Sequence, residues 1–309
     1  MTITTEQATW FAQTFSALAD NVERAVLGKR HVVELVLTAM LSEGHVLLED
    51  VPGTGKTSLA RAVAQSVQGT TTRIQFTPDL LPGDITGITV YDQKTGEFDF
   101  HAGPIFANIV LADEINRASP KTQSALLEVM EEGRVTIDGV TRAVGKPFLV
   151  IATQNPVEQA GTYRLPEAQL DRFLLRTSLG YPDHAATVRI LGRAAAPIDE
   201  LAPVITPGAL AGMAELATDV YVDALVLDYI ARLVDATRSA DEVRLGVSIR
   251  GALALTRASR AHAFTSTRPP GIHCTITTSA SLRRRRVSLA RSSGCCTARP
   301  TRRGSTPRP

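Results

Sequence analysis

The sequence predicts an α/β protein in which helices cover both faces of a parallel sheet, followed by a mostly helical C-terminal region. Two observations support this fold class. Apolar runs such as 109–113 and 147–153 each end in polar residues, which is typical of buried parallel strands. Segments with helical periodicity separate these runs, and strand–helix alternation favours a three-layer arrangement.

The individual elements follow in order along the chain. Residues 6–24 and 31–43 carry the apolar spacing of amphipathic helices. Further helices are expected near 57–67 and 119–132, and helical apolar faces recur through 204–263. Five strands are expected near 45–49, 71–76, 108–113, 147–153 and 173–179. Two β-hairpins are also expected, over 88–100 with a Lys-Thr-Gly turn and over 134–141 with an Asp-Gly turn.

A glycine loop joins the first strand to the next helix and is expected to bind a nucleoside triphosphate. Glycines let backbone N–H groups turn toward an anion, and the helix adds its positive end. Lys56 is expected to reach the β and γ phosphates, and the Thr57 hydroxyl is expected to ligate Mg²⁺. The expected nucleotide-binding residues are Asp50, Val51, Pro52, Gly53, Thr54, Gly55, Lys56, Thr57 and Ser58, together with Asp113.

This loop departs at one position from the general pattern G-x-x-x-x-G-K-[ST]. Asp50 stands where that pattern has its first glycine. The alternative interpretation is a Gly/Thr turn between a strand and a helix that binds nothing.

Polar residues that follow two later strands complete the predicted site. In parallel sheets, nucleotides bind at the carboxyl edge, where these strands end. Asp113 is expected to hold Mg²⁺, directly or through water, and Glu114 to act as the general base for the attacking water. Asn155 is expected to hydrogen-bond the γ-phosphate or that water. Alternatively, Asp113 and Glu114 are acidic residues at the end of an ordinary strand, and Asn155 belongs to an Asn-Pro pair that opens a turn.

Arg172 precedes another apolar stretch, 173–175. An arginine at this place either faces the nucleotide of a neighbouring subunit or pairs with Asp171 at the surface. The residues alone leave both interpretations open.

Four motifs, in this order, resemble those of MoxR-type AAA+ ATPases. They cover residues 49–57, 111–117, 152–156 and 165–173. The resemblance extends from about Ala25 to about Ala263, which is most of the chain. Glu-Asp-Val-Pro-Gly-x-Gly-Lys-Thr is this family's own form of the loop, so the resemblance makes Asp50 a family feature.

The resemblance implies a sheet order of 5-1-4-3-2, a helical lid and specific residue roles. Lys56 and Thr57 would form the Walker A site, Asp113 and Glu114 the Walker B pair, and Asn155 sensor 1. By the same resemblance, Arg172 is an arginine finger that acts on the neighbouring subunit. Arg250 would be sensor 2 and reach the γ-phosphate from the lid, although Ile249 replaces the family's usual proline.

The function that the resemblance implies is an Mg²⁺-dependent ATPase that uses ATP to remodel or mature protein clients. It would work as an oligomeric ring, expected to be a hexamer, with a partner that carries a von Willebrand factor A domain. Two alternatives remain. One is a nucleotide-binding scaffold with impaired hydrolysis, and the other is a nucleic-acid motor.

Charge is distributed unevenly along the 309 residues. Residues 1–242 carry 19 basic and 31 acidic side chains, a net charge of −12, whereas 243–309 carry 14 arginines and no acid. An acidic body disfavours nucleic acid as a partner. The chain lacks an apolar run near the roughly 18 residues of a membrane helix. Its start lacks the pattern of a secretion signal, so a cytoplasmic location is expected.

The expected domain boundaries are an ATPase core at 1–195, an incomplete helical lid at 196–266 and a tail at 267–309. The tail contains all three cysteines and few large apolar residues, so it is expected to be disordered. Three interpretations of the tail are open: a basic arm that binds nucleic acid, a zinc site, or the product of a frameshift. The cysteines and histidine of the tail lack the ligand spacing of a zinc site. The frameshift is favoured because the tail is rich in Arg, Pro and Ser but contains neither lysine nor acid.

Overall fold

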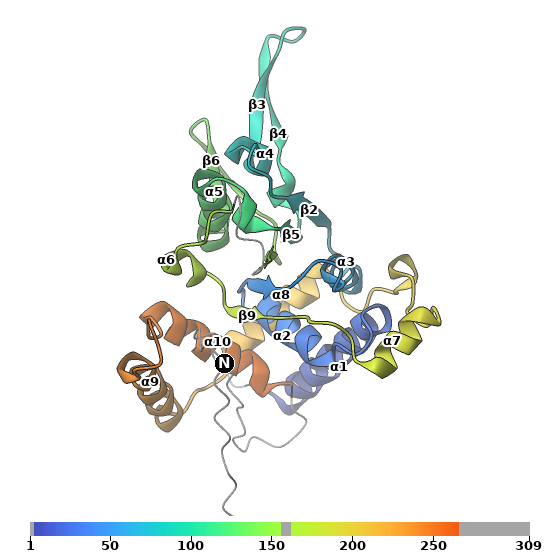
Figure 1. The fold of residues 1–309 in the computed structure, drawn as a ribbon, viewed down its shortest axis with the longest axis vertical. Coiled ribbons are helices and arrows are strands. Elements are labelled where there is room, and N and C mark those ends of the chain that lie inside the picture. Colours follow the sequence, from blue (N-terminus) through green and yellow to red (C-terminus); the bar gives the residue numbers. More distant parts are fainter. Residues whose placement is uncertain (1–2, 156–161, 266–309) are drawn as a thin grey trace, which may run out of the picture.

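The computed structural model describes residues 3–155 and 162–265, and a five-stranded parallel sheet lies at its centre (Figure 1). The strands are β1 (Val46–Glu49), β2 (Thr71–Gln75), β5 (Ile109–Asp113), β8 (Leu149–Gln154) and β9 (Leu175–Thr177). Their order across the sheet is β2-β5-β8-β1-β9. Counted along the chain and read from β9, this is 5-1-4-3-2, so the predicted fold class and strand order are confirmed.

Helices precede, separate and follow these strands. Those before β9 are α1 (Thr5–Ala25), α2 (Arg30–Leu41), α3 (Lys56–Ser66), α4 (Pro82–Thr86), α5 (Pro120–Glu132) and α6 (Glu167–Leu170). Those after β9 are α7 (His184–Leu191), α8 (Pro207–Thr218), α9 (Ala224–Ser239) and α10 (Ile249–Ala263). Short 3₁₀ turns occur at η1 (Pro104–Phe106), η2 (Ile115–Arg117) and η3 (Ile198–Glu200).

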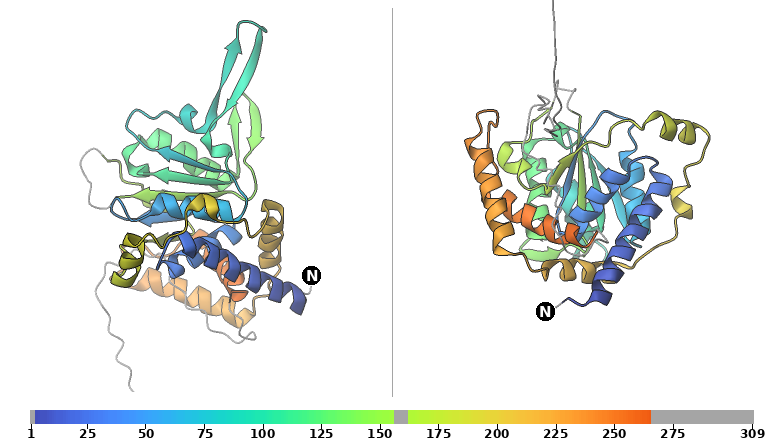
Figure 2. Two further views of the ribbon diagram at one scale, coloured as in Figure 1. Left: turned by 90° about the vertical axis from the view of Figure 1, so that its right-hand side faces the viewer. Right: turned by 90° about the horizontal axis from the view of Figure 1, so that it is seen from below.

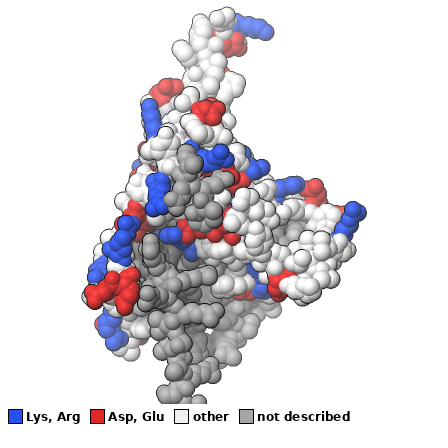
Figure 3. Space-filling model, in the orientation of Figure 1, with Lys and Arg blue, Asp and Glu red and all other residues white. Residues whose placement is uncertain are grey.

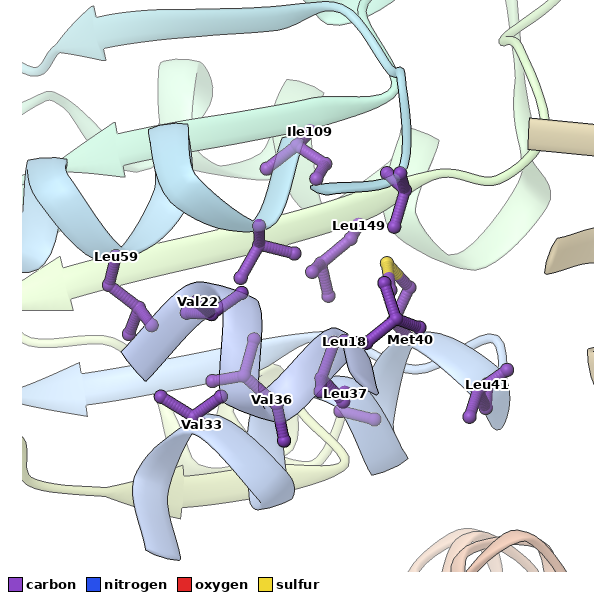
Figure 4. Packing of buried hydrophobic residues seen from close by; sticks show 14 of the residues in the cluster. Leu18, Val22, Val33, Val36, Leu37, Met40, Leu41, Leu59, Ile109 and Leu149 are labelled. Atoms are coloured by element: carbon purple, nitrogen blue, oxygen red, sulfur yellow. The ribbon is translucent and has the colours of Figure 1, made fainter. Parts of the chain in front are cut away.

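Two apolar clusters, one on each face of the sheet, form the core. Successive strand residues point to opposite faces. Leu48 and Leu111 therefore pack in the cluster that α1, α2 and α3 build, part of which is shown in Figure 4. Leu47 and Val110 pack in the other cluster, with α5. The strands are buried from both sides, which explains why they read as continuous apolar runs.

Local signals in the sequence begin and end several helices. Thr4 caps α1, since its hydroxyl accepts from the Gln7 N–H at 3.2 Å and its own N–H donates to Gln7 Oε1 at 2.9 Å. Ser119 caps α5 through its hydroxyl, which accepts from the Thr122 N–H, and Pro120 is in the first turn. Gly133, in a left-handed conformation, ends α5.

Two antiparallel hairpins extend from the body, as predicted. The longer one pairs β3 (Gly87–Asp92) with β4 (Glu97–Ala102) and projects far from the sheet (Figures 1 and 2). The shorter one pairs β6 (Arg134–Ile137) with β7 (Val140–Ala143). In the longer hairpin, the rings of Tyr91 and Phe98 contact each other with 5.1 Å between centroids.

The C-terminal region is helical, as predicted, and α8 and α10 pack against α2 (Figure 2). Leu210 and Met213 of α8 are fully buried in the same cluster as α1 and α2. The boundaries at 195 and 266 stay a prediction. The predicted disorder or frameshift of 267–309 lies outside the described residues. Within the residues that the structure describes, no helix is long and apolar enough to cross a membrane.

Candidate functional site

Two glycines in left-handed conformations bend the loop between β1 and α3. Gly53 has φ +83° and Gly55 has φ +93°, a region that other residues rarely adopt. A Cβ added at Gly53 would meet nothing within 4 Å, so the space beside the loop is open. No side chain caps α3, which begins directly after Gly55. The first N–H groups of α3 are therefore available to an external anion.

Lys56 and Thr57 begin α3 and point toward this loop and the neighbouring strands. The Lys56 ammonium lies over the loop, where it donates to Val51 O at 3.1 Å and Asp50 O at 3.4 Å. Thr57 lines a cavity of about 230 Å³ together with Arg73 of β2 and Leu111 of β5. The ammonium above the loop fits a polyphosphate, and the cavity lies beside it, between α3, β2 and β5.

The side chain of Asp50 turns away from the loop. Its carboxylate is buried and points away from the loop, toward the segment that follows β9. It accepts from Ser178 Oγ at 2.9 Å and from the N–H groups of Leu179 at 2.6 Å and Gly180 at 2.9 Å. With both oxygens occupied, the carboxylate joins the loop to this segment, and only the backbone of Asp50 lies with the loop.

Asp113 ends β5 with both carboxylate oxygens bound. Oδ1 accepts from Thr153 Oγ1 of β8 at 2.6 Å. Oδ2 lies 2.6 Å from the guanidinium of Arg73. Asp113 follows Leu111 by two residues and so shares its face of the sheet, the face on which Thr57 lies. A hydroxyl and a carboxylate are oxygen ligands of the type that Mg²⁺ prefers, so these residues fit the metal.

Glu114 has a left-handed backbone, with φ +56°. Its N–H donates to Thr153 Oγ1 at 2.9 Å, and its Oε2 accepts from Gln75 and Arg117, each at 2.9 Å. Non-glycine residues with positive φ cost energy and persist only where their surroundings hold them. Thr153, Gln75 and Arg117 supply that support and hold the carboxylate at the carboxyl edge of the sheet.

Asn155 follows the last residue of β8, and this position places it beside the loop. The carbonyl of Gln154 accepts from Asp50 N–H at 3.2 Å, so the end of β8 adjoins the start of the loop. Lys56, Thr57, Asp113, Glu114 and Asn155 thus come from three elements that meet at one edge of the sheet. Their convergence was predicted from the sequence, and their roles stay a prediction.

Arg172 and Arg250 lie together at the other end of the parallel strands, near the amino end of β1. Arg172 Nη2 is 3.1 Å from one oxygen of Glu131, and Arg250 Nη2 is 2.5 Å from the other. Glu131 adjoins Met130, whose carbonyl contacts the ring of His45 at 2.9 Å. His45 immediately precedes β1, whereas the glycine loop follows the other end of β1. Both arginines are therefore remote from the phosphate loop of their own chain.

Hydrogen bonds and ion pairs near these arginines join the segment before β9 to the C-terminal helical region. Asp171 accepts from Ser248 Oγ at 2.6 Å, and Glu167 forms an ion pair with Arg244. Arg172 consequently pairs with Glu131 and not with Asp171, which was the partner considered from the sequence. Ser248 also caps α10, whose first turn carries Arg250.

Sequence reasoning missed five residues that surround the predicted ones. They are Arg73, Gln75, Arg117, Glu131 and Thr153. Two signals were present, because Gln75 and Thr153 lie at or near the ends of the strands predicted at 71–76 and 147–153, on the side of the sheet where Asp113 lies. Arg117 pairs with Glu114 three residues before it, whereas the partners of Arg73 and Glu131 depend on packing between segments far apart in the chain.

Comparison with known proteins shows to which class of ATPase this chain belongs. The chain matches the family described as "ATPase family associated with various cellular activities (AAA)" over residues 45–175. It matches the AAA lid domain over residues 235–269. A putative ATPase from Cytophaga hutchinsonii has a similar structure, with a TM-score of 0.77 and 37% identity, covering 84% of this chain and 82% of that one. The fold and the loop thus define an AAA+ ATPase.

Relatives narrow the assignment to one family. The chain is 51% identical to the uncharacterized protein YeaC of Bacillus subtilis, over 79% of this chain and 77% of that protein. It is 44% identical to chaperone MoxR1 of Mycobacterium tuberculosis, over 79% of this chain and 67% of the relative. Protein MoxR of Paracoccus denitrificans is 33% identical, over 77% and 78%. The chain belongs to the MoxR family of AAA+ ATPases.

Proposed function

We propose that this protein is an Mg²⁺-dependent ATPase that works as an oligomeric ring, in the cytoplasm, to remodel or mature protein clients. The observation that carries the proposal is the convergence of the glycine loop, Asp113, Glu114 and Asn155 at one edge of the sheet. These groups offer backbone donors, a cation, metal ligands and a general base within one crevice, which are the parts that phosphoryl transfer to water needs.

Each residue then has a defined task. Lys56 and the N–H groups of the loop hold the β and γ phosphates, and Thr57 and Asp113 hold Mg²⁺. Bound Mg²⁺ neutralises charge on the phosphate oxygens. Glu114 accepts the proton of the attacking water, and Asn155 orients that water. Gln75 and Arg117 keep the Glu114 carboxylate in place.

The position of Arg172 supports assembly. Arg172 lies at the end of the sheet away from its own loop, so we assign it to the nucleotide of another copy. This head-to-tail arrangement closes into a ring, proposed to be a hexamer. Arg250 was expected to reach the γ-phosphate from the lid, but its side chain pairs with Glu131 beside Arg172. A von Willebrand factor A domain partner and a protein client are carried over from the family resemblance, and the name of the relative chaperone MoxR1 agrees with such a role.

Steady-state phosphate release by the parent protein and by Glu114→Gln tests the proposal. Glutamine keeps the shape of the side chain but accepts no proton, so turnover should fall by about 10²-fold or more. ATP binding, measured by calorimetry, should persist in the variant.

A nucleotide-binding scaffold is the second candidate, because the Glu114 carboxylate is already engaged by Gln75 and Arg117. Equal phosphate release by the parent and by Glu114→Gln would favour the scaffold. A nucleic-acid motor is less well supported, since acidic and basic side chains are interspersed over the described residues on the face in Figure 3.

A further inference from the structure

Arg73 occupies the part of the site where a metal ion would be needed. Its Nη2 lies 2.6 Å from Asp113 Oδ2 and also donates to Gln75 Oε1 at 2.8 Å. The other oxygen of Asp113 accepts from Thr153. The carboxylate therefore has a protein-supplied cation on one oxygen and a hydroxyl donor on the other.

The backbone sets this position for Arg73. In the β2–β5 ladder, Arg73 pairs with Leu111 and Gln75 pairs with Asp113. Residues two apart in a strand share a face, so Arg73 and Asp113 lie on the same face of the sheet. The cavity lined by Arg73 and Leu111 also contains Thr57, the other expected metal ligand. The guanidinium thus contacts Asp113, one residue expected to hold Mg²⁺, and lines one cavity with Thr57, the other.

We propose that Arg73 is a positioning residue that balances the charge of Asp113 before Mg²⁺ binds and so sets the Mg²⁺ concentration at which nucleotide is bound. This inference rests on the proposed nucleotide site. Without a cation, the neighbouring Asp113 and Glu114 carboxylates would repel each other. Arg73 relieves that repulsion in the metal-free protein, and its positive charge competes with Mg²⁺ for Asp113 Oδ2.

The binding of a fluorescent ADP analogue, measured as Mg²⁺ is raised from an EDTA-containing buffer to saturation, tests this role. In Arg73→Gln, Mg²⁺ meets no competing cation. The Mg²⁺ concentration for half-maximal binding should therefore fall by about three- to tenfold, the range for one partly exposed charged contact. Arg73→Lys keeps a positive charge and should stay close to the parent.

Arg61→Gln is the matched control. Arg61 lines the same cavity, but its guanidinium pairs with Asp199 at 3.1 Å and makes no contact with Asp113 that the structure shows. The control removes the same charge from the same neighbourhood, so its midpoint should equal that of the parent. Thermal unfolding in EDTA checks that all variants are folded.

Three results would overturn the role of Arg73. They are an unchanged or raised midpoint in Arg73→Gln, an equal shift in Arg61→Gln, and a shift in Arg73→Lys as large as that in Arg73→Gln. Failure of the proposed function is a separate result, since the parent protein itself would then bind no ADP at any Mg²⁺ concentration.

Discussion

Lys56 is the basic side chain of the loop between β1 and α3, and its ammonium lies over the carbonyls of Val51 and Asp50. These neutral oxygens satisfy the ammonium only partly, so a polyphosphate is a better partner for it. The other charged group of the loop, Asp50, points away from the open side and is bound by Ser178, Leu179 and Gly180. Lys56 is therefore the main source of charge complementarity to a phosphate.

Lys56→Ala should weaken ATP binding by about 10²-fold, because it removes one charged hydrogen-bonding group worth about 3 kcal/mol. Isothermal calorimetry with ATP and Mg²⁺ measures the change. Lys146→Ala is the control, since Lys146 pairs with Glu43 at the surface. Equal affinity of Lys56→Ala and the parent would contradict the nucleotide site itself.

His45 is a buried residue whose titration affects stability. Its ring contacts the Met130 carbonyl through Nε2 at 2.9 Å and accepts from Val150 N–H through Nδ1 at 3.0 Å, which requires the neutral ring. Burial, together with the positive charge of Arg257, lowers the pKa of His45 from 6.5 to about 4, although the hydrogen bond to the Met130 carbonyl acts in the opposite direction. The unfolded chain therefore binds a proton at this histidine at higher pH than the folded protein does.

Since the unfolded state carries more protons between about pH 6.5 and 4, the contribution of His45 to stability is complete above pH 6.5 and is lost as the pH falls through this window. The loss should approach about 3 kcal/mol at pH 4. Urea unfolding from pH 7 to pH 4.5 measures it. In His45→Gln the decline should be smaller, and an identical decline in both proteins would assign the effect to other groups.

At the level of elements, the base of the β3–β4 hairpin shows how closely two backbones approach. A Cβ at Gly87 would lie 2.4 Å from His101 O, and one at Gly103 would lie 2.2 Å from Ile85 O. Gly87 also has φ +96°. Glycine at both positions lets the hairpin leave the body directly beside α4, although Tyr91 and Phe98 farther along it remain exposed.

Gly103→Ala should destabilise the protein by about 2 kcal/mol or more, because the added methyl group meets a backbone carbonyl that cannot move alone. Gly208→Ala in α8 is the matched control, since an added Cβ there meets nothing within 4 Å. That change should be neutral or stabilise the protein by up to about 1 kcal/mol. Urea midpoints of the two variants test the difference, and similar midpoints would contradict the close approach.

For the molecule as a whole, the candidate site residues lie at the two ends of the parallel strands. The loop, Asp113 and Glu114 lie at the carboxyl edge, and Arg172 and Arg250 lie at the amino edge, where both pair with Glu131. A carboxylate between two guanidiniums offsets their mutual repulsion and keeps both side chains at one place. In the proposed ring, each copy would supply the loop to one site and Arg172 to the next.

Mixing two inactive variants tests this division. Lys56→Ala should bind ATP weakly but keeps its arginines, whereas Arg172→Ala keeps its loop but lacks the arginine. In the proposed ring, an interface that joins the loop of Arg172→Ala to the arginine of Lys56→Ala would contain one intact site. If copies mix randomly in a ring, an equal mixture should recover up to about a quarter of the parent ATPase rate. A mixture of Lys56→Ala with a Lys56→Ala/Arg172→Ala double variant should recover nothing. No recovery in the first mixture would contradict action across an interface.

The phosphate loop and the strands that end at Asp113 and just before Asn155 were predictable from the chain. The loop depends on contiguous residues, and each strand is marked by its own apolar run. The order of the strands came from the family resemblance, because no single segment contains the information on which strand lies beside which.

The partners of the predicted residues were settled by folding. Asp50 binds residues 128 to 130 positions away, Glu114 is held by Gln75 39 positions away, and Arg250 meets Glu131 119 positions away. Hydrogen bonds and ion pairs act over about 3 Å, so they depend on where distant segments pack. Motifs in consecutive residues can therefore be read from the order of the amino acids, whereas the direction of each side chain and the edge of the sheet that it serves follow from packing.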